Sequence, residues 1–382
     1  MTHFRLSGFY FFYFALLGVL IPYWTLYLES LAFSAATIGA LMGVLHFTRV
    51  LAPNIWGWLA DRTGRRVAIV RMGSLLATVG FVPVFWQDGA LGVGLVMLVF
   101  SFFWNAVLPQ FEVITLNHLG RQAVQYSRIR LWGSVGFILA VVLAGWWLDR
   151  VGVQALPVLV LALLATIWAC TLLLKGHAEK QQSDPPGTAP IWPILRRPQV
   201  LAFFLVCFLV QFGHGPYYTF YSVMMQGLGY ERSAIGLLWA LGVIAEVVLF
   251  IVMPRLMEGF SLRGIMLVSL LLCVLRWTLT ALVPEQLWVM LLAQLLHAAT
   301  FGSLHAVGIA LVQHYFTPHT SGRGQALFSS LGFGAGGALG AIASGQLWAV
   351  LGQYTFLVAA MASLVALGLA WYWIRPEQVE RS

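Results

Sequence analysis

Long apolar runs separated by short polar breaks fill the sequence. Each run has about 20 residues or more, the length that an α-helix needs to cross the hydrocarbon core of a bilayer. We predict spans at residues 6–28, 37–59, 67–86, 90–116, 130–148, 153–174, 200–226, 233–256, 264–283, 286–315, 324–350 and 353–374. The pattern predicts an all-α integral membrane protein with twelve transmembrane helices.

The composition excludes a soluble protein. Hydrophobic residues make up 60% of the chain, charged residues 9%, and the mean hydropathy is +0.86. Soluble domains carry about 25% charged residues because their surfaces face water. A net charge of +8 is typical of nucleic-acid binding in a soluble chain, but in a membrane chain the location of the basic residues decides its meaning. We expect the lipid bilayer as a partner and no nucleic acid.

The longest polar stretch divides the chain. It runs from Lys175 to Pro198 and includes the sequence KQQSDPPG, whose proline, glycine and charge predict an exposed cytoplasmic linker at 175–199. The flanking halves, 1–174 and 200–382, also repeat: two pairs of similar segments share about the same offset. These pairs are Gly57–Arg66 with Pro254–Arg263, and Ser134–Phe137 with Ser330–Phe333. We therefore predict two related six-helix halves.

Basic residues concentrate on one side of the predicted spans, which sets the orientation. With both termini cytoplasmic, the cytoplasmic loops hold Arg62, Arg65, Arg66, Arg121, Lys175, Lys180, Arg196, Arg197, Arg255, Arg263 and Arg323. The opposite loops hold only Arg150 and Arg232 as basic residues. We expect a multi-pass protein of the bacterial-type inner membrane with both termini in the cytoplasm.

The loop after the second span carries a dense motif. Its characteristic positions are Gly57, Asp61, Arg62, Gly64, Arg65 and Arg66. The motif resembles the signature loop of the major facilitator superfamily, which implies a transporter and a conformational latch. Asp61 can accept from a neighbouring helix N-terminus, and the arginines can bridge to carboxylates or lipid phosphates. The alternative is simple anchoring by positive charge, which needs neither Asp61 nor the glycines.

Ionisable residues inside the spans are the candidates for cargo and coupling, because each costs about 2.5 kcal/mol or more unless paired or hydrated. They are Arg49, Glu112, Arg130, Glu246, Arg276 and His297. With His297 neutral, three cations face two anions, and a net positive cavity suits an anionic substrate. Arg49 and Glu246 are related by the repeat offset. Whether Arg49 is structural or functional stays open, and Glu112 and Arg130 can also pin two helices together.

The fourth and fifth spans narrow the family. Arg128–Ser134, with Glu112 upstream, resembles the lactose-permease-like and nucleoside-symporter-like branch of the superfamily. The resemblance implies that Glu112 and Arg130 contribute to the substrate site. The branch also has an acid on its eighth helix, an arginine on its ninth and a histidine on its tenth. Their counterparts here are Glu246, Arg276 and His297. Thr300 and Gln294 replace a carboxylate and a lysine of the lactose permeases, so we expect neither lactose nor an identical proton relay.

The segment from Gln211 to Glu246 is similar to that of the 3-phenylpropionate permeases of this branch. This resemblance implies proton-coupled uptake of an aromatic carboxylic acid. Arginine offers a two-pronged donor for a carboxylate, and aromatic rings stack on an aryl group. Our candidate substrate-binding residues are Glu112, Arg130, Trp132, Tyr217, Tyr218, Trp239 and Arg276.

We hypothesise alternating access, with Glu246 and nearby His297 carrying the coupling proton. We expect the transported small molecule to be an organic anion. We expect no cofactor, and we expect the protein to be a monomer. A sugar or nucleoside symporter and an exporter are alternatives. Cys170, Cys207 and Cys273 lack metal-ligand spacing, and the scarce acids do not cluster, so we predict no metal site and no enzyme.

Overall fold

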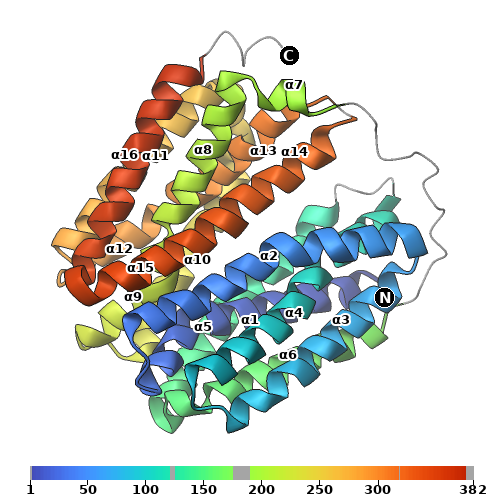
Figure 1. Cartoon of the computed structure of the whole chain (residues 1–382), viewed down its shortest axis with the longest axis vertical. Coiled ribbons are helices and arrows are strands. Elements are labelled where there is room, and N and C mark those ends of the chain that lie inside the picture. Colours follow the sequence, from blue (N-terminus) through green and yellow to red (C-terminus); the bar gives the residue numbers. More distant parts are fainter. Residues whose placement is uncertain (1, 121–124, 175–189, 318, 376–382) are drawn as a thin grey trace. The chain divides into compact units, whose positions relative to one another are not determined.

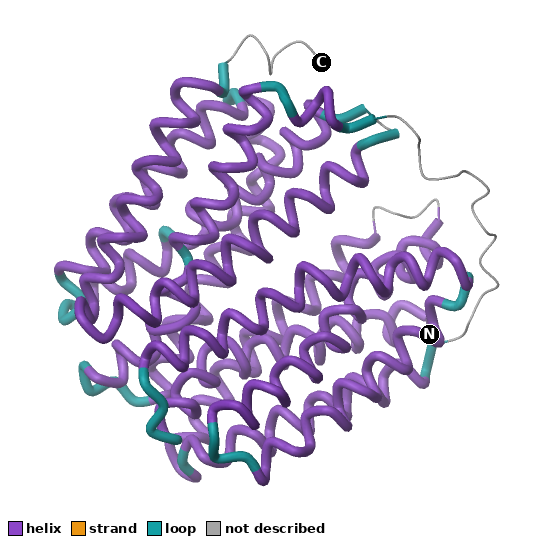
Figure 2. The backbone as a smooth tube through the Cα atoms, viewed as in Figure 1, coloured by secondary structure: helices purple, strands orange, loops and turns teal. Residues whose placement is uncertain are grey.

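A computed structural model describes residues 2–120, 125–174, 190–317 and 319–375, and every regular element within them is helical (Figures 1 and 2). Residues 175–189 of the predicted linker lie outside this part, and so do Arg121, Lys175 and Lys180 of the orientation argument. The long helices are α1 (Thr2–Ser30), α2 (Ala35–Thr63), α3 (Arg66–Phe81), α4 (Ala90–Leu119), α5 (Tyr126–Val151), α6 (Leu156–Leu172), α10 (Arg232–Gly259), α11 (Leu262–Leu282) and α16 (Thr355–Trp373).

Three further crossings are segmented. The first joins α8 (Pro198–Gly213) and α9 (Gly215–Gly227). The second joins α12 (Leu287–Leu295), the π-helix η4 (Ala298–Ser303) and α13 (Leu304–Tyr315). The third joins α14 (Ser321–Phe328), the π-helix η5 (Ser329–Gly336) and α15 (Gly337–Leu351). The short elements are η1 (Val82–Trp86), η3 (Val153–Ala155), α7 (Trp192–Leu195) and η6 (Gly352–Tyr354).

The number of crossings agrees with the sequence pattern. Eleven stretches of the described chain are long and apolar enough to span a membrane, and the last of them, Ser321–Trp373, has 53 residues. This stretch reverses at Gly352, whose φ of 54° ends α15 before η6 and α16 begin. It therefore contains two crossings, and the predicted all-α fold with twelve transmembrane helices is confirmed.

The seventh crossing is broken where the sequence pattern predicts one continuous helix. Pro216 has no N–H to donate to the preceding turn and its ring crowds the backbone there. The chain therefore bends at His214, between α8 and α9. The Nδ1–H of His214 donates to the carbonyl oxygen of Val210 at 2.7 Å, which also accepts the backbone N–H of His214.

The chain divides into two compact units. The first comprises residues 1–182 and 222–240, and the second comprises residues 183–221 and 241–382. Helix α10 thus contributes its first turns to the first unit and its remainder to the second. The division into six-helix halves around a linker at 175–199 stays a prediction.

A joint within the first unit fastens α10 to α1 and α5. Both carboxylate oxygens of Asp149 accept backbone N–H groups at the start of α10, from Arg232 and Ser233, each at 2.9 Å. A carboxylate in this position satisfies donors that have no partner in the helix and complements the positive end of its dipole. The Tyr23 hydroxyl lies 2.7 Å from the carbonyl oxygen of Val141 and 3.1 Å from that of Arg232. One aromatic side chain therefore ties three helices together.

Two arginines cap the C-terminal end of α6 in the same unit. Arg71 on α3 donates to the carbonyl oxygens of Thr171 at 3.2 Å and Leu174 at 2.7 Å. Arg5, in the first turns of α1, donates to the carbonyl oxygen of Leu173 at 3.1 Å. Cations at a helix C-terminus satisfy its free carbonyl groups and complement its dipole. The end of the sixth span is therefore held by the first and third helices.

Candidate functional site

A cluster of polar groups is buried in the second unit around Arg276 of α11. Arg276 is 1% exposed. Its Nη1 lies 3.1 Å from Nδ1 of His297 and donates to the Thr300 hydroxyl at 2.9 Å. The guanidinium also lies over the rings of Tyr217, at 4.5 Å, and Trp277, at 4.2 Å. Because burying a cation is costly, these hydrogen bonds and cation–π contacts are what make this position tolerable.

The contact with Arg276 assigns the protons of His297. A guanidinium can only donate, so the facing Nδ1 of His297 accepts and carries no proton. In this arrangement the ring proton sits on Nε2, which lies 3.9 Å from a carboxylate oxygen of Glu246 on α10. The three side chains thus form a chain in which His297 separates the acid from the arginine.

Several buried polar atoms at this cluster have no hydrogen-bond partner among the described residues. They are Arg276 Nε, Trp277 Nε1, Gln294 Nε2 and His214 Nε2. The first three are donors, and His214 Nε2 is an acceptor because its Nδ1–H already donates to Val210. Buried polar atoms are rarely left without partners, so their concentration here makes this cluster a candidate ligand site. The three donors match a carboxylate, which can only accept hydrogen bonds.

Aromatic rings enclose the same site. The ring of Tyr217 lies 5.3 Å from that of Tyr218, 5.8 Å from that of Trp277 and 5.5 Å from that of His297. The Tyr217 hydroxyl donates to Gln294 Oε1 at 2.9 Å. The second unit therefore brings together five residues predicted from sequence. They are Tyr217, Tyr218, Glu246, Arg276 and His297.

A second polar group lies in the first unit. Glu112 on α4 makes a side-chain hydrogen bond with Tyr126 and interacts electrostatically with Arg130 and, more weakly, with Arg49. The guanidinium of Arg130 lies 3.9 Å from the ring centre of Phe14 on α1. The structure therefore places the predicted Glu112 and Arg130 together, and it places Arg49 in their electrostatic neighbourhood.

The two remaining predicted aromatic residues, Trp132 and Trp239, belong to the first unit. Trp132 is 50% exposed, whereas Arg130, two residues earlier on α5, is half-buried. Trp239 is buried, and its indole N–H donates to the Ser222 hydroxyl at 3.0 Å. This hydrogen bond joins α9 to α10, and a part for either tryptophan in substrate binding stays a prediction.

The sequence interpretation missed Tyr126, the partner of Glu112. Tyr126 stands four residues before Arg130 on α5, so the helical repeat places both on one face. That spacing was the available signal. By the same rule Trp132, two residues after Arg130, points elsewhere. For Trp277 and Gln294, sequence spacing holds no comparable signal, because their roles depend on contacts between helices.

The loop between α2 and α3 is organised around Arg66. Arg66 pairs with Asp61 and donates to Gln110 Oε1 on α4 at 2.5 Å. Asp61 therefore pairs with an arginine of its own motif, which agrees with the arginine–carboxylate bridging that the sequence allowed. A Cβ at Gly57 would lie 3.6 Å from Gln110, an ordinary contact, so this conformation does not demand glycine there. Arg62 lies over the ring of Trp58, and both Arg62 and Arg65 are exposed; their part in a latch stays a prediction.

Gly64→Ala is expected to destabilise the fold by about 1–2 kcal/mol, the cost of a left-handed conformation for an L-residue. Gly64 has a φ of 62° and its N–H donates to the carbonyl oxygen of Ala60, which ends α2. Thermal unfolding of the purified variant measures this. Gly89→Ala is the control, because Gly89 has a negative φ and open space around it. Equal melting temperatures for both variants would contradict the cap.

In the described part of the chain, no group of three or more His, Cys, Asp or Glu side chains is placed to hold a metal ion. A small cavity lies in the second unit beside His305, and Arg276 is not among the residues that line it.

Comparison with known proteins identifies the family. Residues 3–358 match the model of the MFS_1 like family. The "probable 3-phenylpropionic acid transporter" of Escherichia coli (strain K12) is 30% identical over 365 residues, covering 94% of this chain and 95% of that protein. The maltose permease of Geobacillus stearothermophilus is 26% identical over 361 residues, covering 91% and 89%.

Solved structures support the fold. The crystal structure of the nucleoside transporter NupG superposes with a TM-score of 0.85 at 20% identity, covering 98% of this chain and 99% of that one. The twelve crossings of the chain agree with this likeness. The chain belongs to the MFS_1 like family and is a multi-pass membrane transporter of the major facilitator type.

Proposed function

We propose that this transporter imports a small aromatic carboxylic acid, such as 3-phenylpropionate, together with a proton by alternating access. The observation that carries the proposal is the set of unused buried donors around Arg276. The name of the 30% identical E. coli relative points to the same class of substrate. We further propose a monomer in a bacterial inner membrane with both termini in the cytoplasm.

The substrate side of the proposal rests on Arg276 and the rings around it. A carboxylate pairs with a guanidinium through two parallel hydrogen bonds, and Arg276 Nε–H is available for one of them. Trp277 Nε1 and Gln294 Nε2 supply further donors. Tyr217 and Tyr218 stack on an aryl group in the same neighbourhood. Arg130 offers a second cation in the first unit.

The proton side rests on the orientation of His297. A proton cannot bind Nδ1 of His297 while Arg276 donates to that atom. When a substrate carboxylate draws Arg276 away, Nδ1 becomes free, and the anion also offsets the positive charge of the guanidinium. Substrate and proton therefore favour each other's binding, which is the thermodynamic requirement for symport. Glu246 holds the proton or returns it.

Glu246→Gln is expected to abolish accumulation of substrate against its gradient while leaving exchange across the membrane largely intact. Glutamine keeps the shape of the side chain but cannot carry a transferable proton. Uptake driven by an imposed pH gradient into proteoliposomes measures accumulation, and counterflow of labelled substrate measures exchange. Glu258→Gln is the control, because Glu258 lies exposed at the end of the same helix. Undiminished accumulation by Glu246→Gln would remove Glu246 from coupling.

A sugar or nucleoside symporter is the second candidate. The maltose permease and NupG are relatives, and the Glu112–Tyr126 pair of the first unit is suited to hydroxyl groups. Ligand-induced thermal stabilisation separates the two, since a ligand at 100 times its Kd stabilises by about 2.7 kcal/mol. We expect aromatic acids to raise the melting temperature and neutral sugars and nucleosides to leave it unchanged. The reverse order would favour the second candidate.

A further inference from the structure

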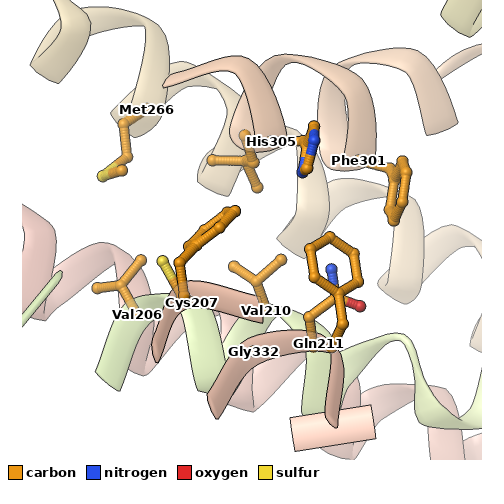
Figure 3. Close-up of a pocket in the computed structure, with 11 residues that line it drawn as sticks. Val206, Cys207, Val210, Gln211, Met266, Phe301, His305 and Gly332 are labelled. Atoms are coloured by element: carbon orange, nitrogen blue, oxygen red, sulfur yellow. The ribbon is translucent and has the colours of Figure 1, made fainter. Parts of the chain in front are cut away.

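A small cavity lies inside the second unit, beside the span that carries His297. Figure 3 shows His305 and Phe301 on one side of it, and Val206, Cys207, Val210 and Gln211 of α8 on the other. Its volume is about 20 Å³. A cavity needs about 10–15 Å³ to hold one water molecule, which also needs polar partners. His305, Gln211 and Cys207 supply such groups on the cavity wall.

A column of rings connects this cavity to the Arg276 cluster. The ring of Phe301 lies 5.3 Å from that of His297 at an interplanar angle of 11°, and 6.3 Å from that of His305 at 5°. The three residues are four positions apart, so they stand on successive turns of one crossing. These two centroid distances limit the separation of the His297 and His305 rings to at most about 12 Å. From His297, His305 lies toward the end of this span that we predict to be cytoplasmic.

The backbone beside the cavity is unusual in two places. The π-helix η4 occupies the stretch between His297 and His305, and the π-helix η5 contains Gly332 and Phe333 of the cavity wall. Such segments are rare and are frequently found at functional sites. The helices are therefore irregular between the two histidines and at the cavity wall formed by Gly332 and Phe333.

From these three observations we infer that His305 and a water molecule in the cavity form a second proton-carrying station, through which the coupling proton leaves Glu246 and His297. The inference rests on the proposed proton coupling and deepens it. An ionisable side chain inside a span is a functional candidate by default. The proposed coupling mechanism uses Glu246 and His297 and assigns no function to His305.

The transfer conserves protons. The Glu246 carboxyl group loses one proton and becomes a carboxylate, the cavity water passes a proton on, and the His305 imidazole becomes an imidazolium. Release of that proton toward the predicted cytoplasmic side restores neutral His305. Phe301 separates the two stations in this conformation, so transfer awaits a movement of its ring. Among the described residues that line the cavity, the titratable side chains are His305 and Cys207 of α8. The lining residues that α11, α14 and η5 contribute carry no charge.

Two substitutions test the station from different sides. His305→Gln keeps a polar side chain but cannot become a cation. Gly332→Ala adds a methyl group at the cavity wall, where a Cβ would lie no closer than 3.7 Å to Cys207 or Gln211. The backbone therefore accepts this methyl group, while the space for water shrinks. Gly368→Ala is the matched control, because Gly368 on α16 faces open space, and His314→Gln controls for loss of a histidine on the same helix α13.

The readouts are pH-driven accumulation and equilibrium exchange of labelled 3-phenylpropionate in proteoliposomes. Proton-transfer groups contribute about 10²–10⁴-fold in enzymes, and for a step shared with helix movement we expect about a 10-fold slower accumulation in both test variants. Exchange should stay within about 2-fold of the unmodified protein, since it needs no proton release. Both controls should behave like the unmodified protein.

The outcomes are distinct. Normal accumulation by His305→Gln would overturn the inference and leave the proposed function standing. Equal losses of accumulation and exchange in both variants would also overturn it, because they indicate a role in substrate binding or packing. If the unmodified protein shows no pH-driven accumulation, the proposed function fails and the inference fails with it.

Discussion

Arg276→Gln is expected to weaken 3-phenylpropionate binding by about 10- to 100-fold. A hydrogen bond to a charged group contributes about 1.5–3 kcal/mol, and each 1.4 kcal/mol is a factor of ten in affinity. Arg276 is fully buried, so solvent does not screen its charge, and its Nε–H has no partner within the described residues. Binding measured by isothermal titration in detergent gives the change in Kd directly.

Two comparisons sharpen this result. Arg276→Lys keeps the charge but loses the two-pronged geometry, so an intermediate loss identifies recognition of a carboxylate by its shape. Arg130→Gln removes the cation of the first unit, which lies against Phe14. If Arg130→Gln abolishes binding and Arg276→Gln does not, the carboxylate site belongs to the first unit and our assignment is wrong.

Gly236→Ala is expected to open the joint between α5 and α10. A Cβ on Gly236 would lie 2.4 Å from the Tyr23 hydroxyl and 2.6 Å from the carbonyl oxygen of Val141, and the backbone atom cannot yield. Overpacking of this kind costs about 1–3 kcal/mol. We expect a cysteine introduced by Ser233→Cys, in a variant without native cysteines, to react with a membrane-impermeant maleimide at least about 5-fold faster.

The same helix supplies the control. Gly259 ends α10 with nothing within 4 Å of an added Cβ, so Gly259→Ala should leave labelling unchanged. Asp149→Asn should act in the direction of Gly236→Ala, because an amide presents one acceptor oxygen to the N–H groups that now share two. Unchanged labelling in Gly236→Ala would show that the joint adapts to the methyl group without opening.

Hydropathy alone predicted the number and order of the crossings, because the length of an apolar run depends only on the thickness of the bilayer. It could not predict the bend at His214, since a proline inside a span stops the helix only where neighbouring contacts satisfy the freed backbone. The π-helices η4 and η5 also escaped prediction, because the energy difference from an α-helix is small and is decided by packing.

The residues of the candidate site were predicted singly, and the structure brings some of them together. Buried charge pointed to Glu246, Arg276 and His297, and the structure places them in contact. Naming both Arg130 and Trp132 for one site was a weaker prediction, because residues two apart on a helix face different directions. The donors left without partners around Arg276 could not be predicted, since whether Trp277 or Gln294 finds a hydrogen bond depends on side chains from other helices.

The contacts of the first unit can form only in a certain order during synthesis. A chain is made from its N-terminus, and the arginine caps on α6 can form as soon as the residues up to Leu174 have left the ribosome. Asp149 is made by then, yet the N–H groups that it accepts belong to Arg232 and Ser233, more than eighty residues behind it. The Asp149 carboxylate therefore lacks these two hydrogen bonds while two further crossings are inserted. They can form only when the start of α10 has been made. The first unit is thus completed only after the seventh crossing, most of which belongs to the second unit.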